Sequence, residues 1–222
     1  MLDETMDAPA ERPPRKLSRD ARRAQLIDAT VLTLADLGFA RTTLSEVARR
    51  AGLSHGLVNF HFATKEGLLS ETLRVLADEY QANWEEALSA APPEPGARLA
   101  ALLLADFEPR VCTHEKLSAW VAFWGEAQAR PLYQANCSGN DDAYVRTLES
   151  ICAALVAAEG VPLDPVAVAR VLRVTTEGVW LDMMTMTAPY ARPEAIRTVM
   201  TCATAFFPRR FTPDGLRPEA PR

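Results

Sequence analysis

Side chains able to bind phosphates and base edges gather in one short stretch of this 222-residue chain, TTLSEVARRAGLSHGLVNFHF at residues 42–62. Ala48 and Gly52 would let two short helices cross closely, because neither has a bulky side chain and glycine tolerates the turn. Ser54 would cap the second helix, whose free backbone N–H groups can bind a phosphate. This spacing predicts a helix-turn-helix, with an ordinary helical hairpin in an α-bundle as the alternative.

The charge of the chain is unevenly distributed, although the net value is only −5. Residues 1–11 carry −4, residues 12–65 carry +6 and residues 66–222 carry −7. An acidic surface repels DNA, so DNA contact is expected only in the basic part. The N-terminus lacks the apolar core of a signal peptide, and no run of about 18 apolar residues could span a membrane. We therefore expect a cytoplasmic protein without a membrane partner.

Apolar residues recur at helical spacing, and no alternating strand pattern is present. The sequence predicts an all-α chain of about nine helices. The first three belong to a DNA-binding domain at residues 18–64, and the others to a helical domain at residues 65–207. Residues 1–17 are expected to form a disordered arm and residues 208–222 a flexible tail. The expected helices lie at 18–37, between Thr42 or Thr43 and Gly52, from Ser54 to about Phe60, at 65–90, and near 97–107, 114–130, 140–158, 165–187 and 193–207.

Residues 26–69 resemble the DNA-binding domain of the TetR family, with a glycine-ended first helix, a threonine-capped second helix, Ala-Gly and then KEGLL. KLSAWVAFW at 116–124 and GVWLDMM at 178–184 resemble the C-terminal domain of the BetI type, which regulates the betaine pathway. The resemblance implies a ligand-responsive repressor that binds double-stranded DNA. Activation, and regulation of another pathway or an efflux gene by a different effector, remain open.

The resemblance also implies roles for individual residues at the DNA. Thr43, His61 and Lys65 would bind phosphates, whereas His55 and Asn59 would reach base edges, with asparagine suited to adenine. His61 stands where the family usually has tyrosine, so we expect phosphate binding to tighten between about pH 7.5 and 6. Basic residues of the arm, Arg12, Arg15, Lys16 and Arg19, would follow the backbone or enter the minor groove. The candidate DNA contacts are Arg22, Arg23, Thr42, Thr43, Ser54, His55, Gly56, Asn59, His61 and Lys65.

Aromatic residues in the second domain could bind an effector. Trp120, Phe123 and Trp124 lie at helical spacing, which is also typical of core packing. BetI-type repressors respond to choline, and aromatic faces hold quaternary ammonium groups. Glu126 and Asp182 are alternatives to Glu177 as a nearby carboxylate. The candidate pocket residues are Trp84, Phe107, Trp120, Phe123, Trp124, Tyr133, Glu177 and Trp180.

The last two expected helices are apolar around much of their surfaces, so they must be buried on more than one side. The resemblance implies that they form a homodimer, which would suit a palindromic operator with recognition helices about 34–36 Å apart.

Other kinds of site find little support in the sequence. It has no Gly-rich phosphate loop, GxSxG or HExxH motif, so we expect neither an enzyme nor a cofactor. Its four cysteines lack metal-ligand spacing, so no metal site is expected. A helical ligand-sensing scaffold without DNA binding is the remaining alternative.

Overall fold

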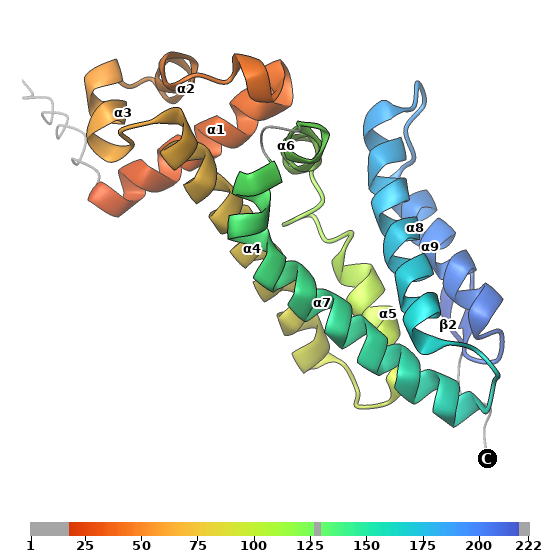
Figure 1. Cartoon of the computed structure of the whole chain (residues 1–222). Helices are drawn as coiled ribbons and strands as arrows, with labels where there is room; N and C mark the ends of the chain where they lie inside the picture. The colour runs from red at the N-terminus through yellow and green to blue at the C-terminus, as the bar shows by residue number, and fades with distance from the viewer. Residues whose placement is uncertain (1–17, 127–129, 218–222) are drawn as a thin grey trace, which may run out of the picture.

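The computed structural model describes residues 18–126 and 130–217, and helices dominate this part of the chain (Figure 1). The predicted all-α class is confirmed, with nine helices in the described residues. They are α1 Arg19–Arg41, α2 Leu44–Ala51, α3 His55–His61, α4 Lys65–Ala90, α5 Pro95–Ala105, α6 His114–Gly125, α7 Arg130–Glu159, α8 Pro165–Thr185 and α9 Arg192–Phe206.

Local hydrogen bonds set the start of each helix in the N-terminal domain, as the sequence predicts. Ser18, Thr43 and Ser54 accept the backbone N–H three residues ahead at 3.1, 3.2 and 3.2 Å. Gly52 ends α2 in the left-handed conformation, with φ of 65°, which a side chain would strain. Gly38 also has a positive φ, so the last turn of α1 is offset from the rest of that helix.

The three N-terminal helices enclose a small core of their own. Leu26 from α1, Val47 from α2 and Val58 from α3 are fully buried and pack together. The start of α4 closes this core, since Leu68 belongs to the same cluster. The long α4 then runs alongside α7 in the second half of the molecule (Figure 1). It therefore joins the two halves physically.

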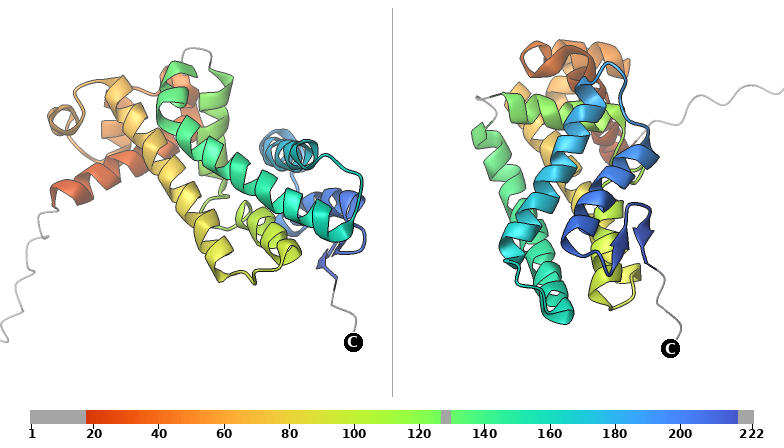
Figure 2. Two further views of the ribbon diagram at one scale, coloured as in Figure 1. Left: turned by 60° about the horizontal axis from the view of Figure 1, so that its bottom comes forward. Right: turned by 90° about the vertical axis from the view of Figure 1, so that its right-hand side faces the viewer.

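The second half of the molecule is a helical bundle. Helices α5, α7, α8 and α9 lie together (Figure 2), and they share a large apolar core with part of α4. Helix α6 contributes Leu117 to that core and packs chiefly against α1. The wall of the bundle nearest the DNA-binding domain is thus formed by a helix that also contacts that domain.

Helix α1 runs to Arg41, past Gly38, rather than ending at residue 37 as predicted. Three further element boundaries differ from the prediction, because proline was treated as a helix breaker. Helix α7 begins at Arg130 rather than near 140, since Pro131 occupies the first turn, where no backbone N–H is needed, and Gly139 is tolerated inside the helix. Helix α5 begins at Pro95, within the expected linker, and Glu94 caps it. Helix α6 ends at Gly125, earlier than expected.

The expected flexible tail and the expected absence of strands are wrong for residues 208–217. Strands β1 (Phe211–Thr212) and β2 (Gly215–Leu216) form an antiparallel hairpin beside α9. Phe211 is fully buried, and Arg209 and Arg210 pair with Glu159 at 2.7 and 2.6 Å. One buried phenylalanine thus anchors a proline-rich segment that has no helical pattern. The expected arm at 1–17 and the end of the tail at 218–222 lie outside the described residues.

Candidate DNA interface and effector cavity

Helix α3 presents a row of small and polar residues on the surface of the N-terminal domain. His55, Gly56 and Asn59 are exposed, as are the caps Thr43 and Ser54. The ring Nδ1 of His55 lies 3.3 Å from Ser45 Oγ and so links α3 to α2. A Cβ at Gly56 would meet no atom within 4 Å beyond the neighbouring backbone of its own helix, so the backbone is open to a close approach there. These five predicted contacts are all accessible to solvent.

Two predicted contacts from α1 are engaged inside the domain. Arg23 donates to the backbone carbonyl of His61 at 3.2 Å, forms an ion pair with Glu71 at 3.1 Å and lies over the ring of Phe62. It therefore joins α1, α3 and α4. Arg22 donates to Gln25 Oε1 at 2.7 Å. Both arginine side chains are therefore bound to other residues of the same domain or of α4.

Thr42 and Lys65 also face inward. Thr42 is buried, and its hydroxyl donates to the carbonyl of Gly38 at 2.8 Å. The ammonium group of Lys65 donates to the carbonyls of Phe39 and Ala40 at 2.8 and 3.3 Å. It thus satisfies orphan carbonyls at the end of α1, a role of basic groups at helix C-termini. Both residues brace the turn between α1 and α2.

His61 lies at the end of α3 in a strongly basic setting. Its Nδ1 is buried without a hydrogen-bond partner, and the ring contacts Phe60 edge to face. Burial lowers the pKa of His61 below its ordinary 6.5, and Arg19, Arg23 and Arg22 lower it further. The pH range in which phosphate binding tightens, expected at 7.5 to 6, is therefore shifted to lower pH.

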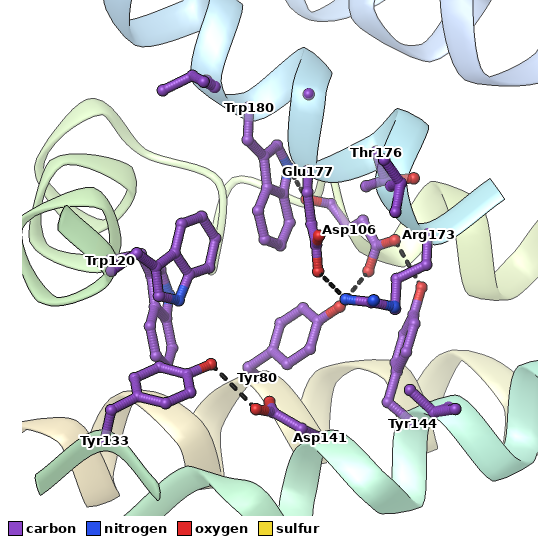
Figure 3. A pocket seen from close by; sticks show the side chains of 15 residues that line it. Tyr80, Asp106, Trp120, Tyr133, Asp141, Tyr144, Arg173, Thr176, Glu177 and Trp180 are labelled. Carbon is purple, nitrogen blue, oxygen red and sulfur yellow. Dashed lines mark hydrogen bonds and ion pairs between the residues drawn. The ribbon is translucent and has the colours of Figure 1, made fainter. Parts of the chain in front are cut away.

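A cavity of about 550 Å³ lies between α4, α6, α7 and α8 (Figure 3). Three indole rings from α6 and α8 and three phenol rings from α4 and α7 face it. Three carboxylates and one guanidinium share its wall. These ten side chains are Trp120, Trp124, Trp180, Tyr80, Tyr133, Tyr144, Asp106, Asp141, Glu177 and Arg173.

The aromatic rings form a connected wall. Trp124 stacks between Trp120, at 6.2 Å between ring centroids, and Trp180, at 6.5 Å. Tyr133 meets Trp120 edge to face, and Tyr80 meets Trp180 in the same way. Rings in this arrangement can offer their negative faces to a cation in the space between them.

Asp106 lies at the end of α5 and is fully buried. The hydroxyl of Tyr80 donates to one carboxylate oxygen at 2.7 Å, and that of Tyr144 donates to the other at 2.8 Å (Figure 3). Burial raises the pKa of Asp106 to about 7, while the two hydroxyl donors lower it and the charge of Glu177 raises it.

The other charged groups of the cavity are paired differently. Glu177 forms an ion pair with Arg173, and Asp141 accepts a hydrogen bond from Tyr133 at 3.0 Å. Burial raises the pKa of both Glu177 and Asp141, while Arg173 lowers each. The wall therefore holds three acids against a single base, which favours a cationic ligand over an anionic one.

Five of the eight predicted pocket residues line the cavity: Trp120, Trp124, Tyr133, Glu177 and Trp180. Trp84, Phe107 and Phe123 do not, because they pack in the apolar cores. The alternative carboxylates, Glu126 and Asp182, are also absent from the lining.

The prediction missed the polar end of the cavity, formed by Tyr80, Asp106, Tyr144 and Arg173. One signal was present in the sequence: Asp106 is a lone acid within the apolar run ALLLADF. An aspartate in such a run is rarely buried unless other polar groups bind its carboxylate. The two tyrosines give no comparable signal.

Helix α6 connects the cavity to the DNA-binding domain. Trp120 and Trp124 face the cavity, whereas Phe123 on the same helix is buried against α1.

The described residues contain no helix long and apolar enough to cross a membrane. Over the same residues, no group of three histidine, cysteine or acidic side chains could hold a metal ion.

Comparison with known proteins places the chain in a family. Residues 26–72 match the family of bacterial regulatory proteins called tetR, and residues 95–208 match the BetI-type transcriptional repressor, C-terminal region. The HTH-type transcriptional regulator BetI of Paraburkholderia xenovorans is 35% identical over 198 residues, which cover 83% of this chain and 93% of that protein. The chain belongs to the TetR family of transcriptional regulators. Within that family its C-terminal region is of the BetI type.

Solved structures show the same fold. A transcriptional regulator structure from Pseudomonas aeruginosa has a TM-score of 0.73 at 24% identity, covering 86% of this chain and 92% of that one. A protein from Saccharomonospora viridis, solved in complex with choline, has a TM-score of 0.69 at 17% identity, covering 82% and 94%. The relatives are transcriptional regulators, so the prediction that this chain is not an enzyme is confirmed.

Proposed function

We propose that this protein represses transcription by binding a palindromic operator as a homodimer, and that a choline-like organic cation releases it from DNA. TetR-family regulators bind DNA operators and small-molecule effectors. The observation that carries the choice of effector is the cavity of three indoles, three phenols and three carboxylates. As a DNA-bound regulator the protein would act in the cytoplasm.

A quaternary ammonium group fits the chemistry of this cavity. It cannot donate a hydrogen bond, so aromatic faces and carboxylate charge are its means of recognition. Trp124 and Trp180 are nearly parallel, with 12° between the ring planes. The polar end, at Asp106, could receive the effector's positive charge or its hydroxyl. The choline complex of the related fold from Saccharomonospora viridis supports this class of ligand.

For DNA binding we propose that α3 enters the major groove. His55 and Asn59 would reach base edges, and Gly56 would allow close approach. Thr43 and the N-terminus of α3 at Ser54 would bind phosphates. Residues 18–64 would then act as the DNA-binding unit and residues 65–207 as the effector and dimer unit.

The dimer is proposed to form through α8 and α9. Val171, Val174 and Leu181 are 45, 52 and 46% exposed and recur along one side of α8. Such a row of solvated valine and leucine is costly in a monomer and suits a two-fold contact. Val174 and Leu181 also line the cavity, so a ligand there would adjoin the interface. Ligand binding could then change the spacing of the two α3 helices.

A titration and a gel shift test the proposal together. Choline should bind in calorimetry, and it should displace the protein from DNA taken upstream of its own gene. Betaine aldehyde and glycine betaine serve as comparison ligands. Trp124→Ala should weaken choline binding without weakening DNA binding, whereas Leu104→Ala, at a solvated position outside the cavity lining, should change neither.

Several results would contradict this function. An absence of heat with all three ligands would remove the proposed effector class. An absence of any gel shift would favour a ligand-sensing scaffold without DNA binding. Sedimentation as a monomer at micromolar concentration would contradict the dimer. Increased reporter transcription on DNA binding would indicate an activator.

A further inference from the structure

Asp106 is held rigidly at the polar end of the effector cavity. Both carboxylate oxygens accept tyrosine hydroxyls, from Tyr80 on α4 and Tyr144 on α7. Its own backbone carbonyl accepts the indole N–H of Trp180 at 3.2 Å. Three elements thus fix both ends of this residue, so the carboxyl group cannot turn away from the cavity it lines.

The charge of this carboxylate has no cationic partner among the described residues. In residues 18–126 and 130–217 no lysine or arginine forms an ion pair with Asp106. The groups that face it are neutral or acidic: Tyr80, Tyr144, Glu177 from α8 and Cys112 from the segment before α6. The guanidinium of Arg173 is bound to Glu177 instead.

Burial of an unpaired carboxylate is costly, and the protein avoids that cost by protonation. The pKa of Asp106 is raised to about 7, chiefly by burial. In the neutral form its O–H donates to one tyrosine oxygen, since a tyrosine hydroxyl can also accept. Near neutral pH both the neutral and the charged form of Asp106 are therefore populated.

We propose that Asp106 is the counter-charge for the effector's cationic group and gives up its proton to solvent when the cation enters the cavity. This inference rests on the proposed function and adds a specificity determinant to it. The carboxyl O–H bond breaks, its electron pair stays on the oxygen, and water or buffer takes the proton. Both tyrosines then donate to the carboxylate, as in the geometry observed here.

The consequence is discrimination by charge rather than by shape. Choline and 3,3-dimethylbutan-1-ol have nearly the same shape, but only choline is a cation. Choline should bind at least about tenfold more tightly at pH 8, because only its charge is compensated by Asp106. Below pH 7 the choline affinity should fall by up to about tenfold per pH unit, since binding then requires loss of a proton.

Calorimetry of the full-length protein tests proton release directly. Choline is titrated at pH 6.5 in buffers of different ionisation enthalpy, whose slope gives the number of protons released. We expect a value of about three-quarters for the wild type, because that is the fraction of Asp106 protonated at pH 6.5 when its pKa is about 7, and a value near zero for Asp106→Asn. Asp142→Asn is the matched control, because it removes an exposed carboxylate of α7 that does not line the cavity and should keep the release. An NMR titration of the aspartate side-chain carbons, with and without choline, locates the proton without a variant.

The outcomes separate this inference from the proposed function. Choline binding without proton release, or release that persists in a folded Asp106→Asn variant, would overturn the role of Asp106 and leave the effector class intact. Equal affinity for choline and its neutral analogue would do the same. If choline fails to bind at every pH, the proposed effector and this inference both fall. The wild-type titrations decide the question even if Asp106→Asn does not fold.

Discussion

The ring of Phe39, in the last turn of α1, meets the ring of Phe123 on α6 edge to face, with centroids 5.9 Å apart. Phe39 also offers its carbonyl to Lys65, at the start of α4. Trp124, the residue after Phe123, lines the cavity. Movement of α6 on ligand binding would therefore reach α1 through this pair, just before the helix-turn-helix begins.

Replacement of Phe123 by leucine should weaken this coupling. The smaller side chain loses contact with Phe39 and costs about 1 kcal/mol of stability. Choline should still bind, but more of it should be needed to displace the protein from operator DNA in a gel shift. Phe211→Leu is the control, because it truncates a buried ring in the other core and should cost stability without changing coupling. Equal loss of coupling in both variants would contradict the role of the Phe39–Phe123 pair.

Replacement of Lys65 by methionine tests whether this residue binds phosphate or braces the domain. Loss of its two carbonyl contacts should lower the free energy of unfolding by about 1 kcal/mol. The slope of operator affinity against salt concentration should stay the same. Arg49→Met, at an exposed position paired with Glu46, should leave stability almost unchanged. A slope reduced by about one in Lys65→Met would instead show that Lys65 contacts a phosphate, as the family resemblance implied.

The pH dependence of operator binding should reflect the lowered pKa of His61. Protonation of His61 adds a positive charge near a phosphate, so the pKa of His61 is higher in the DNA complex than in the free protein. Operator affinity therefore rises as the pH falls from the pKa of the complex to that of the free protein. Because the pKa of His61 in the free protein lies below its ordinary 6.5, the rise should extend below pH 6.5. Fluorescence anisotropy from pH 5.5 to 8 measures it. His61→Tyr should remove the rise; if it persists there, another group is responsible.

Replacement of Asn59 by alanine should relax sequence preference. An exposed asparagine on α3 that pairs with a base contributes about 1–3 kcal/mol to discrimination. Operator affinity should fall accordingly, while affinity for unrelated DNA stays the same. Gln134→Ala, an exposed substitution on α7, should affect neither. A uniform loss on all sequences would assign Asn59 to the phosphate backbone.

Features that depend on residues close together in the chain could be predicted from the sequence. The caps at Thr43, Ser54 and Thr64 each bond to a backbone N–H three residues ahead, so residue type and spacing are sufficient to predict them. The aromatic spacing of Trp120 and Trp124 likewise placed two rings on one side of a helix. Helix class, motif and family follow from such local patterns.

Contacts between segments far apart in the chain could not be predicted from the sequence, because they depend on how the helices pack. Trp84 and Trp180 are both buried, yet only Trp180 lines the cavity. Lys65 was expected to face DNA, but its partners 25 and 26 residues away draw it inward.

The sequence alone determined an all-helical regulator with a helix-turn-helix. The tertiary structure decided which side chains share a cavity. Tyr80 and Tyr144 lie 26 and 38 residues from Asp106, and only the packing of α4, α5 and α7 brings the three together. Burial then shifts the carboxyl pKa, and burial is a property of the packed helices rather than of any local sequence.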